Sequence, residues 1–178
     1  MKKEITFIAM AILCLAFSHA AQAQTVKYRG DVELAHGVAT HPETTSAVVK
    51  LQTTHGILIK DACYLGLGLG YGYNYVSDAQ YVPVISLSSS YYFGDPSWKY
   101  RPFVNARTGL QMGDEGTNSY ALTVSGALGW GSHRFSTKIG YESEQAWIQT
   151  LSSRGKFSEE RKTRGYFYLS LAIQFGKK

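Results

Sequence analysis

The sequence predicts an all-β fold, an eight-stranded antiparallel barrel of up-and-down topology that spans a membrane. Three observations predict this fold. Apolar and polar residues alternate with a period of two along most of the chain, as they do in two-faced β-strands. Eight segments alternate in this way, and most span about 11 to 14 residues, which suits membrane-crossing strands better than the shorter strands of soluble proteins. No segment has the sustained 3.6-residue period of a helix, and an even number of long strands can close an up-and-down barrel.

The first 23 residues are interpreted as a secretory signal peptide and are set aside from the fold. Two lysines follow the initial methionine, and a mostly apolar run covers 5–17. An Ala-Gln-Ala pattern then predicts cleavage between Ala23 and Gln24. The apolar run is shorter than the roughly 20 residues that a transmembrane helix needs. The mature chain, 24–178, is expected to form one outer-membrane barrel domain.

The first two expected strands separate apolar from polar side chains clearly. In the first, Val32 and Leu34 flank Glu33, so the carboxylate projects from the opposite face. In the second, Lys50 lies between Val49 and Leu51 in the same way. The segment "HPETT" between them has a proline and polar residues, which indicates a turn.

The third expected strand, "YLGLGLGYGYNYV", has glycine at every second position from Gly66 to Gly72. A dinucleotide-binding loop would need Gly-x-Gly-x-x-Gly followed by a helix. Here the spacing stays at two and no helix follows. The glycines are therefore interpreted as one lumenal column of small residues, and the alternating leucines and tyrosines are expected to face outward.

The later strands repeat this division, with Ser, Gly and Ala on one face and aliphatic or aromatic residues on the other. Residues 143–164 carry many charges and are expected to form a long loop. That loop either binds an extracellular ligand, for example through basic residues that meet lipopolysaccharide phosphates, or is simply solvated. The expected strands are 25–38, 46–59, 64–76, 82–93, 100–112, 119–131, 135–142 and 165–175.

Alternation alone fits both a soluble barrel, with its apolar face inside, and a membrane barrel, with its apolar face outside. The polar face is mostly Gly, Ser and Ala rather than Lys, Glu and Thr, and small residues suit the narrow lumen of eight strands. The aromatic residues are expected to form two girdles around an aliphatic band, as at the two membrane interfaces. The girdle beside the chain termini contains Tyr28, Tyr91, Phe93, Trp98, Trp130, Phe135 and Phe175, and the other contains Tyr73, Tyr75, Tyr120 and Tyr141.

Composition and motif spacing argue against several classes of function. Charged residues make up 17% of the chain, against about 25% in ordinary globular proteins. The net charge of +5 is modest, and neither a basic helix nor an aromatic-basic platform is present, so nucleic-acid binding is not expected. No His, Cys or carboxylate cluster has metal-ligand spacing, so neither a metal nor a cofactor is expected.

The expected lumenal face carries eight charged residues. They could form an ion path, or a paired network that plugs the barrel and satisfies its buried charges. The second interpretation is favoured because eight strands enclose no continuous aqueous channel. The eight residues are Lys27, Arg29, Asp31, Glu33, Lys50, Arg107, Lys138 and Glu142.

Some barrels of this size are enzymes that modify lipid A, and such a deacylase would need a serine nucleophile beside a histidine base on the outward face. His36 is the only histidine expected there, and no serine lies two residues from it. His133 and Ser136 are three residues apart and therefore point to opposite faces. The chain is therefore expected not to be an enzyme. A lipid A deacylase or acyltransferase is the alternative, and a soluble periplasmic ligand-binding barrel is a second one.

The pattern resembles the small outer-membrane β-barrel proteins of the Bacteroidota, many of which have no assigned function. The resemblance rests on "TTHG" at 53–56, on the Gly-x-Gly-x-Gly strand after it, and on a final strand closed by Phe175. In bacterial outer-membrane proteins the final strand carries an assembly signal, although here three residues follow Phe175. The resemblance implies a Gram-negative outer membrane, with both termini in the periplasm. It also implies contact with outer-membrane lipids, lipopolysaccharide and the assembly machinery, and a structural, adhesive or surface-protective role of the loops.

Overall fold

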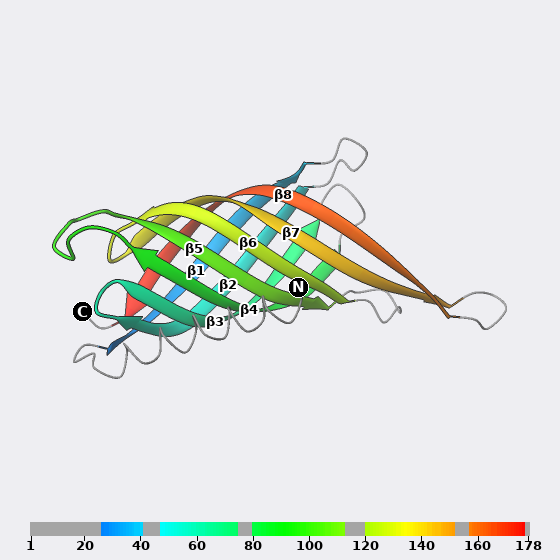
Figure 1. The fold of residues 1–178 in the computed structure, drawn as a ribbon, viewed down its shortest axis with the longest axis horizontal. Helices are drawn as coiled ribbons and strands as arrows, with labels where there is room; N and C mark the ends of the chain where they lie inside the picture. The colour runs from blue at the N-terminus through cyan, green and yellow to red at the C-terminus, as the bar shows by residue number, and fades with distance from the viewer. Residues whose placement is uncertain (1–25, 41–46, 75–79, 113–119, 152–156, 177–178) are drawn as a thin grey trace, which may run out of the picture.

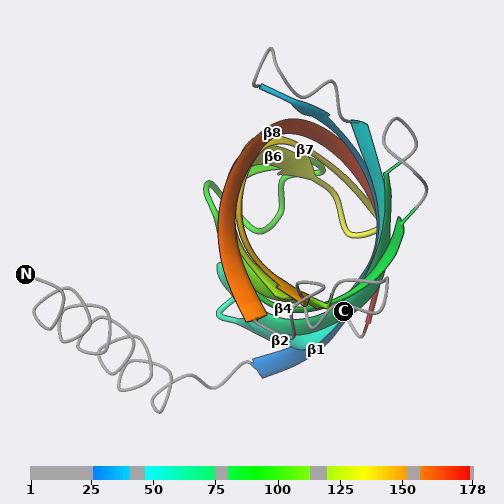
Figure 2. The same ribbon diagram turned by 90° about the vertical axis from the view of Figure 1, so that its right-hand side faces the viewer.

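The computed structural model describes residues 26–40, 47–74, 80–112, 120–151 and 157–176, and these form a closed antiparallel barrel. Each strand pairs with its neighbours in sequence, and β1 pairs with β8 to close the ring (Figures 1 and 2). The predicted fold class and strand number are thus confirmed. The strands are β1 (Val26–Ala39), β2 (Ala47–Ile59), β3 (Cys63–Asn74), β4 (Gln80–Tyr92), β5 (Arg101–Met112), β6 (Tyr120–Gly131), β7 (Phe135–Leu151) and β8 (Phe157–Gly176).

The first strand begins and the last strand ends at the same end of the barrel, which we call the terminal rim; the other end is the loop rim. The expected signal peptide, its cleavage site, His41 and Tyr75 lie outside the described residues. In the described part of the chain, no helix has the length and apolar character needed to cross a membrane.

A three-residue turn at the terminal rim joins β2 to β3. Lys60 and Asp61 adopt left-handed backbone conformations, with φ of 51° and 53°. The Ala62 amide donates a hydrogen bond to the Ile59 carbonyl at 3.0 Å, which closes the turn. This tight connection sets the register in which Ile57 lies opposite Leu65, so both project outward.

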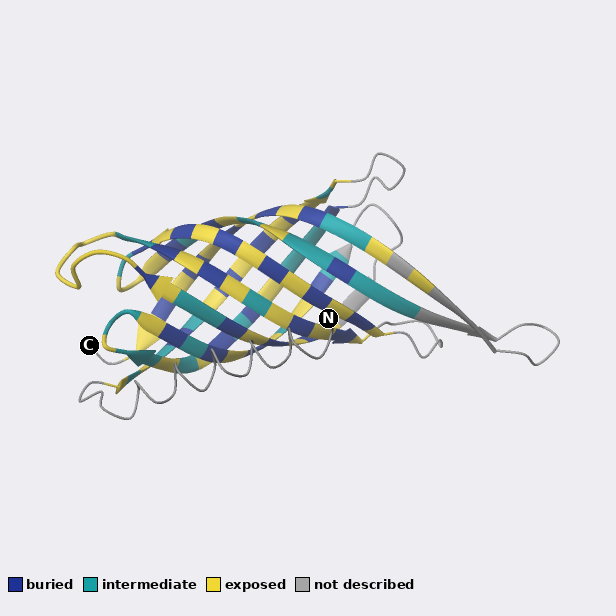
Figure 3. Cartoon of the chain, in the orientation of Figure 1, coloured by how far each residue is buried: buried dark blue, intermediate teal, exposed yellow. Residues whose placement is uncertain are grey.

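The outward face of the barrel is apolar, as the alternation predicts. Leu67 and Leu69 keep 67% and 62% of their surface exposed, whereas Thr54 and Ser86 on inward-facing positions are buried. In β6 the alternation of exposed and buried residues is unbroken. Figure 3 shows the resulting checkerboard of exposed and buried residues around the barrel wall.

Exposed aromatic side chains lie near both rims. At the terminal rim, the rings of Tyr91 and Phe93 are 5.0 Å apart, centroid to centroid. At the loop rim, Tyr120 stacks on Trp147 with 5.2 Å between centroids. The members of the terminal girdle predicted from the sequence are all exposed, namely Tyr28, Tyr91, Phe93, Trp98, Trp130, Phe135 and Phe175.

The prediction of a long loop over 143–164 is wrong. β7 and β8 continue past the other strands as a two-stranded hairpin, which projects from the loop rim (Figure 1). Their pairing runs without interruption from Ser143 opposite Gly165 to Leu151 opposite Phe157. The charges suggested a loop, but a hairpin that leaves the barrel has water on both faces and needs no apolar side.

The lumen is less uniformly small than the sequence predicts. Tyr64, Tyr92 and Phe103 point inward and form a buried cluster near the terminal rim. Glycines make room for these rings. A Cβ at Gly66, two residues along β3 from Tyr64, would collide with the Tyr64 hydroxyl, and a Cβ at Gly129 on the neighbouring strand β6 would collide with the Phe103 ring. The inward glycines and aromatics are therefore complementary in volume.

Two glycines of β3 give a matched test of this packing. A Cβ at Gly70 would lie 2.6 Å from the Leu51 carbonyl oxygen, which belongs to the backbone of the neighbouring strand. At Gly72 the nearest atom is Lys50 Cγ, at an ordinary 3.5 Å. We expect Gly70→Ala to lower the free energy of unfolding by about 1 to 3 kcal/mol, as overpacking does. Gly72→Ala should be neutral or stabilise by up to about 1 kcal/mol.

Urea unfolding of both variants, refolded in the same lipid vesicles, measures this difference. Equal effects of the two substitutions would contradict the close backbone approach at Gly70.

Candidate functional site

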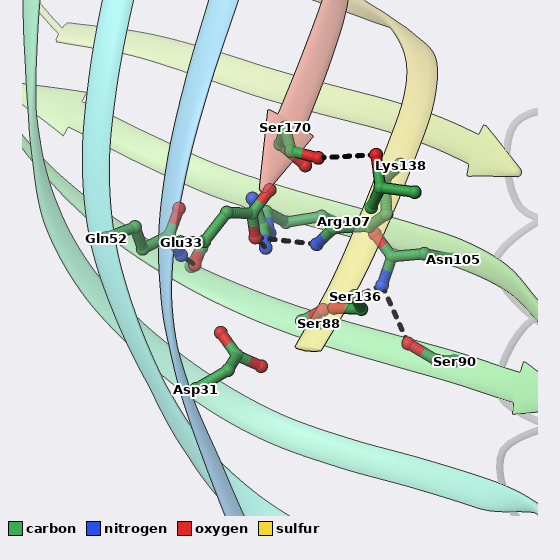
Figure 4. A network of polar contacts seen from close by, with 12 residues as sticks. Asp31, Glu33, Gln52, Ser88, Ser90, Asn105, Arg107, Ser136, Lys138 and Ser170 are labelled. Carbon is green, nitrogen blue, oxygen red and sulfur yellow. Dashed lines mark hydrogen bonds and ion pairs between the residues drawn. The ribbon is translucent and has the colours of Figure 1, made fainter. Parts of the chain in front are cut away.

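The centre of the lumen contains a buried ionic cluster built by three strands. Glu33 of β1 accepts hydrogen bonds on one oxygen, Oε2, from Arg107 Nη2 of β5 at 2.5 Å and from Lys138 Nζ of β7 at 2.6 Å (Figure 4). The Glu33 side chain is 1% exposed. No two of these strands are neighbours, and β1 and β5 lie on opposite sides of the eight-stranded ring, so the bonds hold separated parts of the barrel wall together.

A second ion pair lies nearer the loop rim, between Lys50 of β2 and Glu142 of β7. A cavity of about 20 Å³ separates it from the Glu33 cluster, with Tyr166 and Tyr168 among the lining residues. Such a volume holds about one water molecule. Side chains therefore fill this part of the lumen.

The other charged residues assigned to the lumen have different neighbours. Lys27 pairs with Asp61 of the β2–β3 turn, with 3.0 Å between Nζ and Oδ1. The Arg29 guanidinium donates to Gln174 Oε1 and lies 4.6 Å from the centre of the Tyr92 ring. Asp31 takes part in no ion pair among the described residues. The eight residues thus separate into a central triad, one loop-rim pair and contacts near the terminal rim.

Neutral hydrogen bonds complete the lumenal network. Asn105 Nδ2 donates to Ser88 Oγ at 3.0 Å and to Ser90 Oγ at 2.9 Å, which ties β5 to β4. Gln174 Nε2 donates to Ser136 Oγ at 2.9 Å, which ties β8 to β7. No motif in the sequence singles out these amides, although the column of serines on the inward face of β4 indicates that hydrogen-bonding partners are needed.

Arg101 holds the β4–β5 connection in place at the terminal rim, a role that no pattern in the sequence predicts. The acceptors of its guanidinium are the backbone carbonyls of Asp61, Tyr92, Phe93 and Gly94. In the same connection the Ser97 amide donates to Asp95 Oδ1 at 2.8 Å. This hydrogen bond stabilises the carboxylate and holds the pKa of Asp95 below its usual value.

The described histidines, His36, His55 and His133, lie in three different settings. His36 points outward, and its cross-strand neighbours are Val49 and Leu169. His55 bonds to the Tyr28 hydroxyl at 2.6 Å and to Thr53 Oγ1 at 3.0 Å.

His133 is exposed in the β6–β7 turn. Among the described residues no group of three or more His, Cys, Asp or Glu side chains could hold a metal ion.

Phe175, the residue assigned to a possible assembly signal, lies on the outward face near the end of β8. Its ring lies edge-on to His55, 5.7 Å between centroids, and 6.5 Å from Tyr28. It also covers Gly30, where any Cβ would collide with the Phe175 ring. These contacts join β8 to β1 and β2 across the closure of the barrel.

No known protein family and no curated protein matches this sequence. Solved structures do match in fold, and the class they define is the eight-stranded outer-membrane barrel. Neisserial surface protein A is 18% identical with a TM-score of 0.55, over 85% of this chain and all of that one.

The outer-membrane enzyme PagL is 13% identical with a TM-score of 0.59, over 80% of this chain and 98% of that one. The N-terminal barrel domain of Pseudomonas aeruginosa OprF is 15% identical with a TM-score of 0.50, over 85% of this chain and all of that one. At these identities the likeness shows the fold.

Proposed function

We propose that the chain is an integral outer-membrane barrel protein that is not an enzyme and has a structural, adhesive or surface-protective role. The observation that carries this proposal is the outward face of the barrel wall. Leu67, Leu69, Leu171 and their neighbours expose a continuous aliphatic band, while charged groups such as Glu33 are buried inside. Water-soluble monomers rarely expose apolar patches of this extent, and a lipid bilayer would cover the band.

In this proposal the terminal rim faces the periplasm and the loop rim faces the exterior. The projecting hairpin of β7 and β8 is then the part of the described chain that reaches furthest from the membrane. Near its base, the Arg161 guanidinium lies 5.7 Å from the Trp147 ring centre and donates to Gln145 Oε1 at 2.6 Å. A cation beside an interfacial aromatic ring suits contact with lipopolysaccharide phosphates, which makes lipopolysaccharide the partner we propose for this surface.

We assign the lumenal network a structural role and not that of an ion path. The triad around Glu33 and the pair between Lys50 and Glu142 occupy the centre of the lumen. We expect the purified protein to show no stable, large conductance in planar-bilayer recordings. A reproducible, large single-channel conductance from protein of verified purity would contradict the structural role of the lumenal network.

Membrane placement is tested by fractionation together with heat-modifiable migration. Outer-membrane barrels keep their fold in cold SDS, so unheated protein should migrate differently from boiled protein and should fractionate with the outer membrane. Recovery in the soluble periplasmic fraction would instead support the soluble ligand-binding barrel.

The enzymatic alternative is modification of lipid A, since one protein of similar fold is an outer-membrane enzyme. Mass spectra of lipid A from cells with and without the protein should be identical if the chain is not an enzyme. A lost or transferred acyl chain that depends on the protein would establish the alternative.

A further inference from the structure

A cavity of about 430 Å³ opens at the terminal rim, beyond the ionic cluster of the lumen. Lys27 and Arg29 of β1 and Arg101 at the start of β5 line it, together with Tyr92 and with Trp98 of the β4–β5 connection. Its volume lies within the range of about 300 to 1,000 Å³ that is usual for small-molecule sites. We call it the rim cavity.

The rim cavity is cationic. Lys27, Arg29 and Arg101 line it, and Asp61 is the one carboxylate among the described residues that do so. Asp61 pairs with Lys27. Neither arginine has an ion-pair partner among the described residues, although Asp31 and Asp95 interact electrostatically with Arg29 and Arg101 from outside the lining. Within the lining the three cations outnumber the one carboxylate, so the potential of the rim cavity favours anions.

The two arginines are held in different ways. Arg101 is fixed by the four backbone carbonyls that accept its hydrogen bonds, so it contributes charge but has little donor capacity left. Arg29 lies beside the Tyr92 ring and donates one N–H to Gln174. A guanidinium has five N–H donors, so Arg29 retains donors for an oxyanion, in the two-bond geometry that this group favours.

We propose that the rim cavity binds a small organic oxyanion, a carboxylate or phosphate attached to an apolar or ring-shaped group. Arg29 holds the oxyanion, Lys27 and Arg101 add long-range attraction, and Tyr92 and Trp98 pack against the attached group. In the membrane placement proposed above the rim cavity opens to the periplasm, but the site itself depends only on the barrel and its β4–β5 connection.

The three tryptophans provide a direct assay in detergent micelles. Trp98 lines the rim cavity, Trp130 points outward, and Trp147 lies at the loop rim, so their indole N–H resonances report three places. Titration with benzoate or phenyl phosphate should shift the Trp98 resonance and leave Trp147 unchanged. Trp98→Phe assigns the signal.

Further ligands distinguish the contribution of charge to binding from the contribution of ring packing. Acetate and inorganic phosphate, which lack the ring, should bind more weakly, and benzylamine, which has the ring with a positive charge, should not shift Trp98. Stronger binding of benzoate identifies a carboxylate site, and stronger binding of phenyl phosphate identifies a phosphate site.

Substitutions test the role of Arg29. Arg29→Gln should weaken binding at least about tenfold, because a charge-assisted pair of hydrogen bonds is lost. Arg164→Gln removes the same charge near the loop rim, where Arg164 lies 4.0 Å from Glu144, and should leave binding unchanged.

Asp61→Asn is expected to raise the affinity of the rim cavity for anions. A misfolded variant would not show such a gain. It removes the carboxylate that competes for Lys27, and asparagine tolerates the left-handed conformation of Asp61. We expect binding to become several-fold tighter. The proposal is overturned if no anion shifts Trp98, if benzylamine shifts it as strongly as benzoate, or if Arg29→Gln and Arg164→Gln bind equally well while Asp61→Asn gains nothing.

Discussion

Replacing Glu33 with glutamine is expected to lower the free energy of unfolding by about 3 to 5 kcal/mol, the usual result of removing one partner from a buried ionic group. Glu33 is the one carboxylate that bonds to both Arg107 and Lys138, whose side chains are 11% and 7% exposed. Glutamine keeps the volume but removes the charge to which both cations bond, and leaves Asp31, which pairs with neither, as the nearby carboxylate. Urea unfolding of the barrel in lipid vesicles, followed by tryptophan fluorescence, measures the loss.

Two further variants show whether the effect is electrostatic. Glu142→Gln also removes a lumenal carboxylate, but Glu142 pairs with one cation, Lys50, and both side chains are more exposed than Glu33, so the loss should be smaller. Adding Lys138→Met to Glu33→Gln removes one unpaired cation and should restore part of the stability. Equal losses from Glu33→Gln and Glu142→Gln would contradict a central role of the triad.

Leu67→Arg should lower the free energy of unfolding in lipid vesicles by about 2 to 4 kcal/mol, because Leu67 lies in the middle of β3 on the outward face, where a bilayer contains least water. Cys63→Arg, on the same face at the terminal rim, should lower it by at most about 1 kcal/mol. On a water-soluble barrel both positions are exposed surface, and each substitution would change stability by less than about 0.5 kcal/mol. The dependence on depth therefore distinguishes a lipid-facing wall from a water-facing one.

The period of two in the sequence was sufficient to predict eight strands and the outward face. Leu67 and Leu69 illustrate why: register is specified wherever one face differs strongly from the other, and a shift of one residue would expose the opposite set. The rule does not extend to 143–164, because a hairpin that leaves the barrel needs no apolar face for the alternation to mark. Trp147 and Arg161 lie opposite each other there, a pairing that the charge pattern does not predict.

The partners inside the lumen could not be predicted from the sequence in the same way. Glu33 meets residues 74 and 105 positions away in the chain. Which residues face each other across a barrel depends on the stagger of all the strands, and the alternation of a single strand does not contain that information. The packing of Phe103 against Gly129 depends on the same stagger, because the two residues lie on neighbouring strands and the glycine makes room for the ring only when the strands are assembled.

The rim cavity and the plugged centre give the two halves of the lumen different properties. Side chains of both charges fill the centre, and the cations there have carboxylate partners. At the terminal rim, by contrast, the aromatic cluster of Tyr64, Tyr92 and Phe103 adjoins, through Tyr92, an open cavity whose lining carries more cations than carboxylates. A small anion can therefore enter this cavity without a path through the barrel.

The most direct test of the proposed membrane placement is the accessibility of a single cysteine at position 67 in intact cells. Cys63, the cysteine in the described chain, is first replaced by serine, and Leu67→Cys is introduced. We predict that a water-soluble maleimide leaves this cysteine unlabelled until hot SDS unfolds the protein, because a thiol within the bilayer forms too little of the reactive thiolate, whereas Arg161→Cys in the same background is labelled at once. Equal labelling of the two cysteines, in fractions where the protein is folded, would show that the leucine face meets water and would contradict the transmembrane barrel.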